Sequence, residues 1–328
     1  MYVRNGAMKK ALIIMIAAFV ALSCVFANGQ TESVYPSQGI EFVIPASAGG
    51  GSDRMARLLI EIIQKNNLCP QTITASNKAG GSGATGQAYV NASPNPDYVI
   101  FTINDAHTLG GNKAGTIPSG NFTQLALLGV DEVLFVTKGD APYSTMEEAV
   151  AAIKDNPKSL VVGCADQLDR ICVQDINASY GVEFTDTLFG GAGDIATAIL
   201  GGHVQFGMFN PSECVALINS GDLKALALFS EERTSVAGLE NVPTFTEMGH
   251  PELVYKMTRG VLGNANMSRE AQLFWSDVFE KVCATDDWQK GYCAANGVTP
   301  MYMNCDDYSA FYVENEKSLL EKLSKLPD

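Results

Sequence analysis

The sequence contains few of the residues from which enzyme active sites and metal centres are usually built. Histidine occurs three times in 328 residues, at His107, His203 and His250, and never at a spacing typical of metal ligands. Neither a C-x-x-C pair nor the G-x-S-x-G motif of hydrolases occurs. We therefore expect a protein that is not an enzyme and that holds no metal ion and no cofactor.

Basic residues are also scarce relative to acidic ones. The chain has 22 Lys and Arg against 36 Asp and Glu, which gives a formal net charge of −14 at pH 7. This charge argues against nucleic acid and anionic membrane surfaces as partners. Local backbone dipoles would have to hold an anionic ligand, because the field of the whole protein opposes its binding.

Internal repeats and low-complexity tethers are absent from the sequence as well, which argues against a structural or adhesive surface protein. Hydrophobic residues make up 46% of the chain and charged residues 18%, as in folded globular proteins. A chain of 328 residues is long enough for two domains, each with its own core.

The one long apolar run lies near the N-terminus. It covers residues 11–26, follows Lys9 and Lys10, and ends at a suitable cleavage site, Val25-Phe26-Ala27. The run is shorter than the ~20 residues that a membrane-spanning helix needs. We therefore predict a signal peptide over residues 1–27 and export to the periplasm. Alternatively, Ala21-Leu22-Ser23-Cys24 resembles a lipoprotein signal, in which Cys24 would carry a lipid anchor.

The cysteines after the signal peptide would enter an oxidising compartment. Cys283 and Cys293 are candidates for a disulfide there, and buried free thiols are the interpretation for most of the others. The sequence leaves the pairing open. Because the number of these cysteines is odd, at least one has no partner within the chain. They are Cys69, Cys164, Cys172, Cys214, Cys283, Cys293 and Cys305.

The chain is organised around residues 40–64. Residues 40–44 are apolar and predict a buried strand, and Gly49-Gly50-Gly51 predicts a tight turn. Apolar residues then recur at the spacing of one helix face, with Ser52 or Asp53 as the N-cap. Free N–H groups and the positive end of the helix dipole make such a turn an anion site. A turn that only connects two elements is the alternative.

A second glycine-rich loop follows over residues 77–86. Gly81, Gly83 and Gly86 fit the G-x-G-x-x-G motif of dinucleotide-binding proteins. That motif begins directly after its strand, whereas here residues 76–80 intervene, and an exported protein would seldom meet a nicotinamide cofactor. We therefore interpret this segment as a second glycine loop that faces the first.

Strands and helices alternate along the chain, which predicts an α/β fold with mostly parallel sheets flanked by helices. Two apolar runs, near residues 130 and 226, are candidates for strands that cross between domains. We therefore predict a discontinuous first domain, residues 28–130 and 227–328, with a second domain, residues 131–226, inserted into it. The predicted strands are residues 40–44, 71–75, 98–103, 125–137, 159–163, 204–209 and 223–229. The predicted helices cover residues 54–64, 87–90, 145–156, 168–180, 194–200, 210–218, 269–283 and 306–325, with a short helix within the loop 104–121.

Several segments carry motifs that occur in the same order in a known family. Residues 43–53 read Val-Ile-Pro-Ala-Ser-Ala-Gly-Gly-Gly-Ser-Asp, and residues 77–83 read Asn-Lys-Ala-Gly-Gly-Ser-Gly. Later segments are residues 199–210, residues 220–228 and Asn241-Val-Pro-Thr-Phe-Thr-Glu-Met-Gly249. Together they resemble the Bug/TctC solute receptors of tripartite tricarboxylate transporters, over nearly all of the chain that follows the signal peptide.

The resemblance implies a two-domain, type II periplasmic binding protein of Venus-flytrap form. Such a receptor binds a small carboxylate in the interdomain cleft, with citrate-like and dicarboxylate ligands foremost. It delivers the ligand to the large and small integral-membrane subunits of the transporter, and we expect hinges near residues 130–136 and 223–229 and a monomer. The ligand-binding residues that the resemblance implies are Ala48, Gly49, Gly50, Asp53, Gly80, Gly81, Ser82, Gly83, His107, Ala165, Asp166, Gln167, Leu168, Asn210 and Ser212.

The sequence also departs from the family pattern. Residues 164–170 replace a turn that is usually rich in glycine and serine. Asn210 stands where aspartate is common, and a neutral amide cannot pair with an ammonium group, which disfavours amino acids as ligands. Arg170 and Arg259 are candidates to hold a second carboxylate through a bidentate guanidinium group, or are solvated surface residues. A sensing role with a signalling partner, or a receptor for a non-carboxylate solute, remains the alternative function.

Overall fold

The computed structural model describes residues 35–115 and 118–326. All strands and helices named below belong to one compact unit, Gln38–Asp328. The predicted signal peptide and Cys24 lie outside the described residues. Among the helices of the described ranges, none combines the length and apolar character that crossing a membrane requires.

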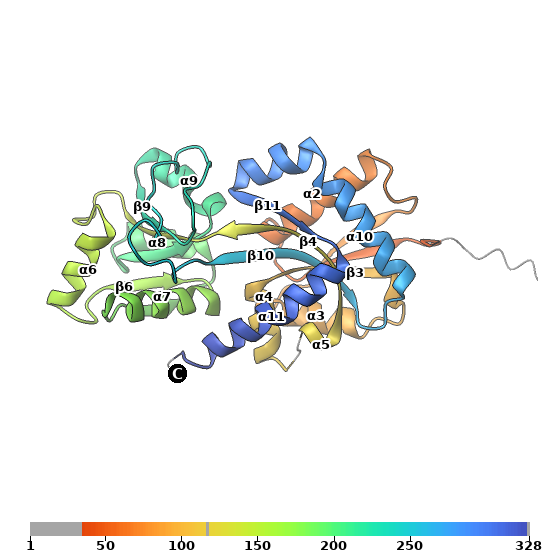
Figure 1. Cartoon of the computed structure of the whole chain (residues 1–328), viewed down its shortest axis with the longest axis horizontal. Helices are drawn as coiled ribbons and strands as arrows, with labels where there is room; N and C mark the ends of the chain where they lie inside the picture. Colours follow the sequence, from red (N-terminus) through yellow and green to blue (C-terminus); the bar gives the residue numbers. More distant parts are fainter. Residues whose placement is uncertain (1–34, 116–117, 327–328) are drawn as a thin grey trace, which may run out of the picture. The chain divides into compact units, whose positions relative to one another are not determined.

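Residues from both ends of the large unit build a six-stranded mixed sheet. In spatial order its strands are β11 (Val298–Met303), β4 (Phe122–Glu132), β10 (Lys256–Asn264), β3 (Val99–Asn104), β1 (Ile40–Ile44) and β2 (Ile73–Asn77) (Figure 1). β1 runs parallel to β2 and β3. β10 runs antiparallel to β3 and β4, and β11 runs antiparallel to β4.

Residues from the middle of the chain build a five-stranded sheet. In spatial order its strands are β7 (Thr185–Leu188), β6 (Val161–Cys164), β8 (Phe206–Phe209), β5 (Leu134–Lys138) and β9 (Leu223–Leu228). β6 runs parallel to β7 and β8, whereas β5 runs antiparallel to β8 and β9. The predicted α/β class is thus confirmed, but both sheets are mixed, so they are less parallel than the sequence predicts.

Helices flank both sheets (Figure 1). The α-helices are α2 (Gly51–Lys65), α3 (Ala84–Asn91), α4 (Asp105–Lys113), α5 (Pro118–Asn121), α6 (Met146–Asp155), α7 (Gln167–Tyr180), α8 (Ala192–Leu200), α9 (Pro211–Ser220), α10 (Arg269–Cys283) and α11 (Cys305–Leu323). Two short 3₁₀-helices, η1 (Gly81–Gly83) and η2 (Pro96–Tyr98), and one π-helix, η3 (Asp287–Ala294), complete the set.

The five-stranded sheet is buried on both faces. Along β5, Phe135 belongs to one apolar cluster, whereas Leu134 and Val136 belong to another. This alternation is expected because successive side chains of a strand point to opposite faces. A strand that is buried on both faces is a continuous apolar run, which is why the sequence signal at residues 125–137 was strong.

The two connections between the sheets differ from the predicted crossing strands. The run at residues 125–137 forms two strands, because the chain leaves the first sheet after Glu132 and enters the second at Leu134. The return takes longer, since β9 ends at Leu228 and β10 begins at Lys256. Side chains of the intervening residues pack on the core of the second sheet. The division into domains at residues 130 and 227 stays a prediction.

β7, β10 and β11 were not predicted from the sequence, for identifiable reasons. β7 has four residues and is half-buried or exposed throughout. β10 contains Lys256, Arg259 and two glycines, which interrupt its apolar pattern. β11 contains Pro300, which weakens a strand signal. Pairing with β4, a long buried strand, overrides these weak local signals.

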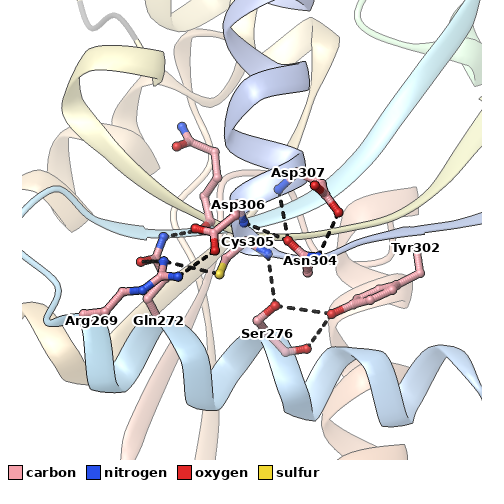
Figure 2. Close-up of polar contacts among 9 residues, drawn as sticks. Arg269, Gln272, Ser276, Tyr302, Asn304, Cys305, Asp306 and Asp307 are labelled. Atoms are coloured by element: carbon pink, nitrogen blue, oxygen red, sulfur yellow. Dashed lines mark hydrogen bonds and ion pairs between the residues drawn. The ribbon is translucent and has the colours of Figure 1, made fainter.

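A polar network joins α10, β11 and the start of α11 (Figure 2). The Oγ atom of Ser276 accepts a hydrogen bond from the backbone N–H of Cys305 at 3.0 Å. The backbone carbonyl of Ser276 accepts one from the hydroxyl of Tyr302 at 2.9 Å. Asn304 caps α11, and Arg269 forms an ion pair with Asp306 at 2.7 Å. These contacts anchor the C-terminal helix against α10.

The seven described cysteines are all free thiols. Cys69 is half-buried and the other six are buried. The candidate pair of Cys283 and Cys293 is therefore not a disulfide in this structure.

A buried carboxylate fixes the connection between β1 and α2. Asp53 accepts hydrogen bonds from the backbone N–H of Gly49 at 2.9 Å, Arg57 Nε at 3.0 Å and Asn77 Nδ2 at 2.9 Å. The bond from Arg57 contributes most to holding the pKa of Asp53 at about 2, below its ordinary value of 3.8. The N-cap of α2 is Gly50 and not Ser52 or Asp53, because Asp53 serves as this anchor instead.

The second glycine loop rests on α4. A Cβ atom on Gly83 would lie 2.9 Å from the ring of His107, and one on Gly110 would lie 2.3 Å from the backbone oxygen of Ser82. Gly83 also has a φ of +92°, and Ser82 a φ of +50°. The close approach of η1 and α4 therefore requires glycine at two positions.

We expect Gly110→Ala to destabilise the protein by about 1–3 kcal/mol, because the new methyl group meets backbone atoms of η1. The measurement is urea unfolding. Gly193→Ala is the matched control, since it lies in α8 with nothing within 4 Å of its Cβ position. Equal stabilities of the two variants would contradict the packing of η1 on α4.

We expect Asp53→Asn to lower the free energy of unfolding by about 1–2 kcal/mol at pH 7. Because the folded-state pKa is lowered, the stabilisation by the ionised group is fully present above about pH 4. It is lost as the pH falls towards the folded-state value of about 2. Urea unfolding of both proteins at pH 7 and pH 3 measures this trend.

Asp277→Asn is the control for that measurement, because it removes an exposed carboxylate that pairs with Lys281 on α10. The free energy of unfolding of Asp53→Asn is compared with that of the unchanged protein at both pH values. If the difference is as large at pH 3 as at pH 7, the charge of the carboxylate is not what stabilises the loop.

Candidate functional site

Four strands lead directly into helices whose first residues carry the predicted site. β1 and β3 precede α2 and α4, and β6 and β8 precede α7 and α9. α4 and α7 are in contact, and the glycine loop η1 packs on α4. Arg259 lies beside Gly51 at the start of α2, and its charge acts on Asp166 and Glu213 near the starts of α7 and α9.

The first glycine loop is exposed but offers fewer free donors than the sequence predicts. Gly49 donates its N–H to Asp53, and Gly50 donates its N–H to the carbonyl of Ser47 at 3.3 Å. The first N–H groups of a helix have no acceptor within it. The donors of α2 that remain for a ligand therefore begin at Gly51, one residue after the predicted ones.

The predicted loop residues differ in exposure. Asp53 is 4% exposed, and its carboxylate accepts a hydrogen bond from the backbone of the loop. It therefore supports the candidate site from behind and does not face it. Gly83 is also buried. The exposed members of the two glycine loops are Ala48, Gly49, Gly50, Gly80, Gly81 and Ser82.

Arg259 lies at the N-terminus of α2. Its guanidinium nitrogens would be 3.6 Å and 3.8 Å from a Cβ atom on Gly51. Arg259 Nε donates to Asp131 Oδ2 at 2.8 Å, and Nη2 contacts the same oxygen. Burial opposes the charge of Arg259, but the carboxylate of Asp131 outweighs this effect and the pKa of Arg259 is raised. Arg259 is thus a buried cation and not a solvated surface residue.

His107 is a buried, neutral imidazole beside this cation. Burial, followed by the charge of Arg259, lowers the pKa of His107 to about 4. The backbone N–H of His107 donates to Asn104 Oδ1 at 2.8 Å. Its Nδ1 has no hydrogen-bond partner among the described residues.

The turns after β6 and β8 enclose a cavity of about 50 Å³. We call this space the strand-end cavity. It also contacts Val133, which lies between β4 and β5. Further residues that line it are Ala165, Asp166, Asp169, Asn210, Glu213 and Met257. The predicted residues Ala165, Asp166 and Asn210 therefore meet at one place, and Leu168 lines it too. Gln167 and Ser212 are half-buried but do not line the cavity.

The carboxylates of this cavity also cap helices. Asp166 Oδ1 accepts from the backbone N–H groups of Leu168 at 2.7 Å and Asp169 at 3.2 Å. Asp169 Oδ2 accepts from the N–H of Ala165 at 2.7 Å. Burial between the packed turns raises the pKa of Asp166 and, more strongly, of Asp169, where the charge of Asp166 adds to the effect.

Glu213 faces the same cavity from α9. Its Oε2 accepts the backbone N–H of Asn210 at 2.9 Å. Surrounding protein raises the pKa of Glu213, although part of its side chain still reaches solvent. The charge of Arg259 opposes the rise for both Glu213 and Asp166. Arg259 of the first sheet and the carboxylates of the second are thus within electrostatic reach of one another.

Two predicted residues have structural partners. The amide of Asn210 donates to the carbonyl of Glu132 at 2.8 Å. Arg170 forms an ion pair with Asp186 at 2.6 Å, beside β7. The guanidinium of Arg170 is therefore already engaged within the second sheet and its flanking helix.

Asp131, Asp169 and Glu213 were not predicted from the sequence as residues of the site. The sequence contains a signal for Asp169 and Glu213, because each lies in the first turn of a helix that follows a predicted strand. Acidic residues are favoured at this position of a helix. Asp131 gave no local signal, because its role depends on pairing with Arg259 from a distant strand. Among the described residues, no group of His, Cys, Asp and Glu could hold a metal ion.

Comparisons with known proteins identify the family and the fold. Residues 55–324 match the tripartite tricarboxylate transporter family receptor, TctC. A UPF0065 protein in the gbd 5′ region of Cupriavidus necator is 24% identical over 98% of both chains.

Solved structures share the fold. A TctC solute-binding protein from Polaromonas is 26% identical, with a TM-score of 0.71 over 89% of this chain and 100% of its own. A protein of R. palustris solved with adipate is 19% identical, with a TM-score of 0.76 over 89% of this chain and 98% of its own. With a family match over residues 55–324 and solved relatives of the same two-sheet fold, the chain belongs to the Bug/TctC family of solute receptors, which are not enzymes.

Proposed function

We propose that this receptor captures a small carboxylate between its two sheets and delivers it to the membrane subunits of a tripartite tricarboxylate transporter. Receptors of the family bind small carboxylates and work with such subunits. The observation that carries the proposal is the position of Arg259 beside Gly51, at the start of α2.

The chemistry of this position suits a carboxylate. The first N–H groups of α2 lack intrahelical acceptors, and the helix dipole adds partial positive charge. Arg259 adds a planar guanidinium group, which matches the two oxygens of a carboxylate. His107, being neutral, adds a ring that can hydrogen-bond without repelling Arg259.

The remaining predicted residues complete the proposed site. The exposed residues of both glycine loops would lie against the ligand, as would Ala165 and Gln167 by the start of α7, although the N–H groups of Gly49, Gly50 and Ala165 are engaged within the protein. Asp166, Asn210 and Ser212 would contact it from the second sheet. A larger cavity of about 440 Å³ contains none of these residues and lies by segments 230–236 and 289–300. We therefore assign the ligand to the smaller, strand-end cavity.

Ligand capture in this proposal involves closure of two domains. The first would comprise residues 28–130 and 227–328, the second residues 131–226, and the hinges would lie near residues 130–136 and 223–229. The small volume of the strand-end cavity, about 50 Å³, fits a site that opens to admit its ligand. The protein would act as a monomer after export to the periplasm, either free or held by a lipid on Cys24.

Thermal melting of the ligand-stripped protein against carboxylates, amino acids, sugars and phosphates tests the proposal. A ligand at 100 times its dissociation constant should stabilise the fold by about 2.7 kcal/mol, which raises the melting temperature measurably. We expect stabilisation by carboxylate-containing compounds only. A shift with sugars or phosphates alone would overturn the proposal.

Arg259→Lys tests the proposed anchor. Lysine keeps the charge beside Asp131 but loses the two-nitrogen fork, so we expect carboxylate affinity to fall about 10–100-fold by calorimetry. Arg233→Lys is the matched control, because Arg233 is an exposed residue that pairs with Glu247. Unchanged affinity in a folded Arg259→Lys protein would remove Arg259 from the site.

A further inference from the structure

Asp105, in the first turn of α4, is a buried carboxylate that binds two other elements. Its side chain is 1% exposed, and it is not among the residues that line the strand-end cavity. Asp105 Oδ2 accepts the backbone N–H of Thr258 at 3.1 Å. Oδ1 accepts the side-chain amide of Asn315 at 2.9 Å and also contacts the hydroxyl of Thr258. One carboxylate of α4 therefore holds both β10 and α11.

This carboxylate continues the pairing of β10 where β3 ends. β10 pairs with β3 as far as Arg259, which lies opposite Asn104, the last residue of β3. Thr258 precedes Arg259, and its N–H is the group that Asp105 accepts. A buried backbone N–H needs an acceptor, because leaving it unpaired is costly. The position of the β10 backbone next to Arg259 thus depends on Asp105.

Asp105 also lies close to the second proposed ligand contact, His107. Both residues are in the first turn of α4, where the N-cap Asn104 accepts the backbone N–H of His107. Burial raises the pKa of Asp105, and the charge of Arg259 opposes this rise, as expected for groups that lie near each other. Through Thr258, Asp105 therefore fixes Arg259 relative to the turn that carries His107.

Asn315 connects this arrangement to α11, the C-terminal helix. Tyr312, almost one turn before Asn315, belongs to the core of the six-stranded sheet. Leu319, one turn after Asn315, belongs to a core cluster of the five-stranded sheet, and α11 is in contact with α7. Asn315 thus holds Asp105 from a helix that is packed on both sheets.

We propose that Asp105 and Asn315 are positioning residues for ligand capture. Asp105 sets the position of Arg259 relative to His107, and Asn315 holds the carboxylate of Asp105 in place. A guanidinium fork must match the two oxygens of a carboxylate in direction as well as in charge. A small displacement of Arg259 therefore weakens binding although its charge remains. This inference rests on the proposed function, because both residues act through Arg259.

Asn315→Ala tests the positioning role by calorimetry on the ligand-stripped protein, with acetate, succinate, adipate, citrate and benzoate as probes. Alanine suits a helix, so the variant is expected to fold. We expect the affinity for the tightest probe to fall about 3–30-fold, because Asp105 loses the donor that holds it.

Asn112→Ala is the matched control. Asn112 is half-buried, as Asn315 is, and its amide also bridges α4 and α11, donating to Glu316 at 3.1 Å. It lies in the last turn of α4, away from the turn that carries Asp105 and His107. We expect similar losses of stability for the two alanine variants in urea unfolding. The affinity of Asn112→Ala should change by less than about twofold.

A double variant shows whether Asn315 acts through Arg259. When one residue acts through the other, the two losses do not add. We therefore expect Asn315→Ala to lower the affinity of an Arg259→Lys protein by less than about twofold. A full 3–30-fold loss in the Arg259→Lys protein as well would overturn the positioning role.

The remaining outcomes separate this inference from the proposed function. Unchanged affinity in Asn315→Ala, or equal losses of affinity in Asn315→Ala and Asn112→Ala, would overturn the positioning role and leave the carboxylate receptor intact. No binding of any of the five probes by the unchanged protein would overturn both.

Discussion

The buried ion pair between Arg259 and Asp131 is the constraint on which the site depends. The two residues are 6% and 2% exposed, and removing two charges from water costs several kcal/mol per ion unless the geometry compensates. Loss of either partner would leave an uncompensated charge inside the protein. The pair therefore requires β4 and β10 to stay in register, and this register in turn places the guanidinium at the start of α2.

The same pair limits what the site can bind. Asp131 already neutralises Arg259, so the guanidinium offers a ligand directional hydrogen bonds more than excess positive charge. The starts of α2 and α4 add oriented backbone donors, as expected for an acidic protein that must hold an anion locally. The starts of α7 and α9 carry acidic residues that accept backbone N–H groups. The carboxylates that cap these helices also line the strand-end cavity.

Local patterns in the sequence revealed the parts of the site that follow strands directly. The turn after β1, the glycine loop at η1 and the turns after β6 and β8 all carry glycine or capping signals. The sequence could not reveal residues whose role depends on distant pairing, such as Asp131 and the strand β10 that holds Arg259. Nor could it distinguish Asp53 as an anchor from Asp53 as a ligand contact, because both roles suit the same position. Asp53→Asn and Gly110→Ala probe features that appear only when the loops are seen packed.

The irregular pairing of β10 with β4 has a consequence for how the Arg259 side chain could move. The register shifts between Arg259 and Gly260, and such irregularities increase the local twist of a strand pair. Beyond this point β4 is paired with β11 as well as with β10, and the chain enters the second sheet at Leu134, shortly after β4 ends at Glu132. A change in the twist of these strands would turn the Arg259 side chain together with the segment that leads from β4 into the second sheet. The position of the Arg259 guanidinium and the angle between the two sheets would then change together.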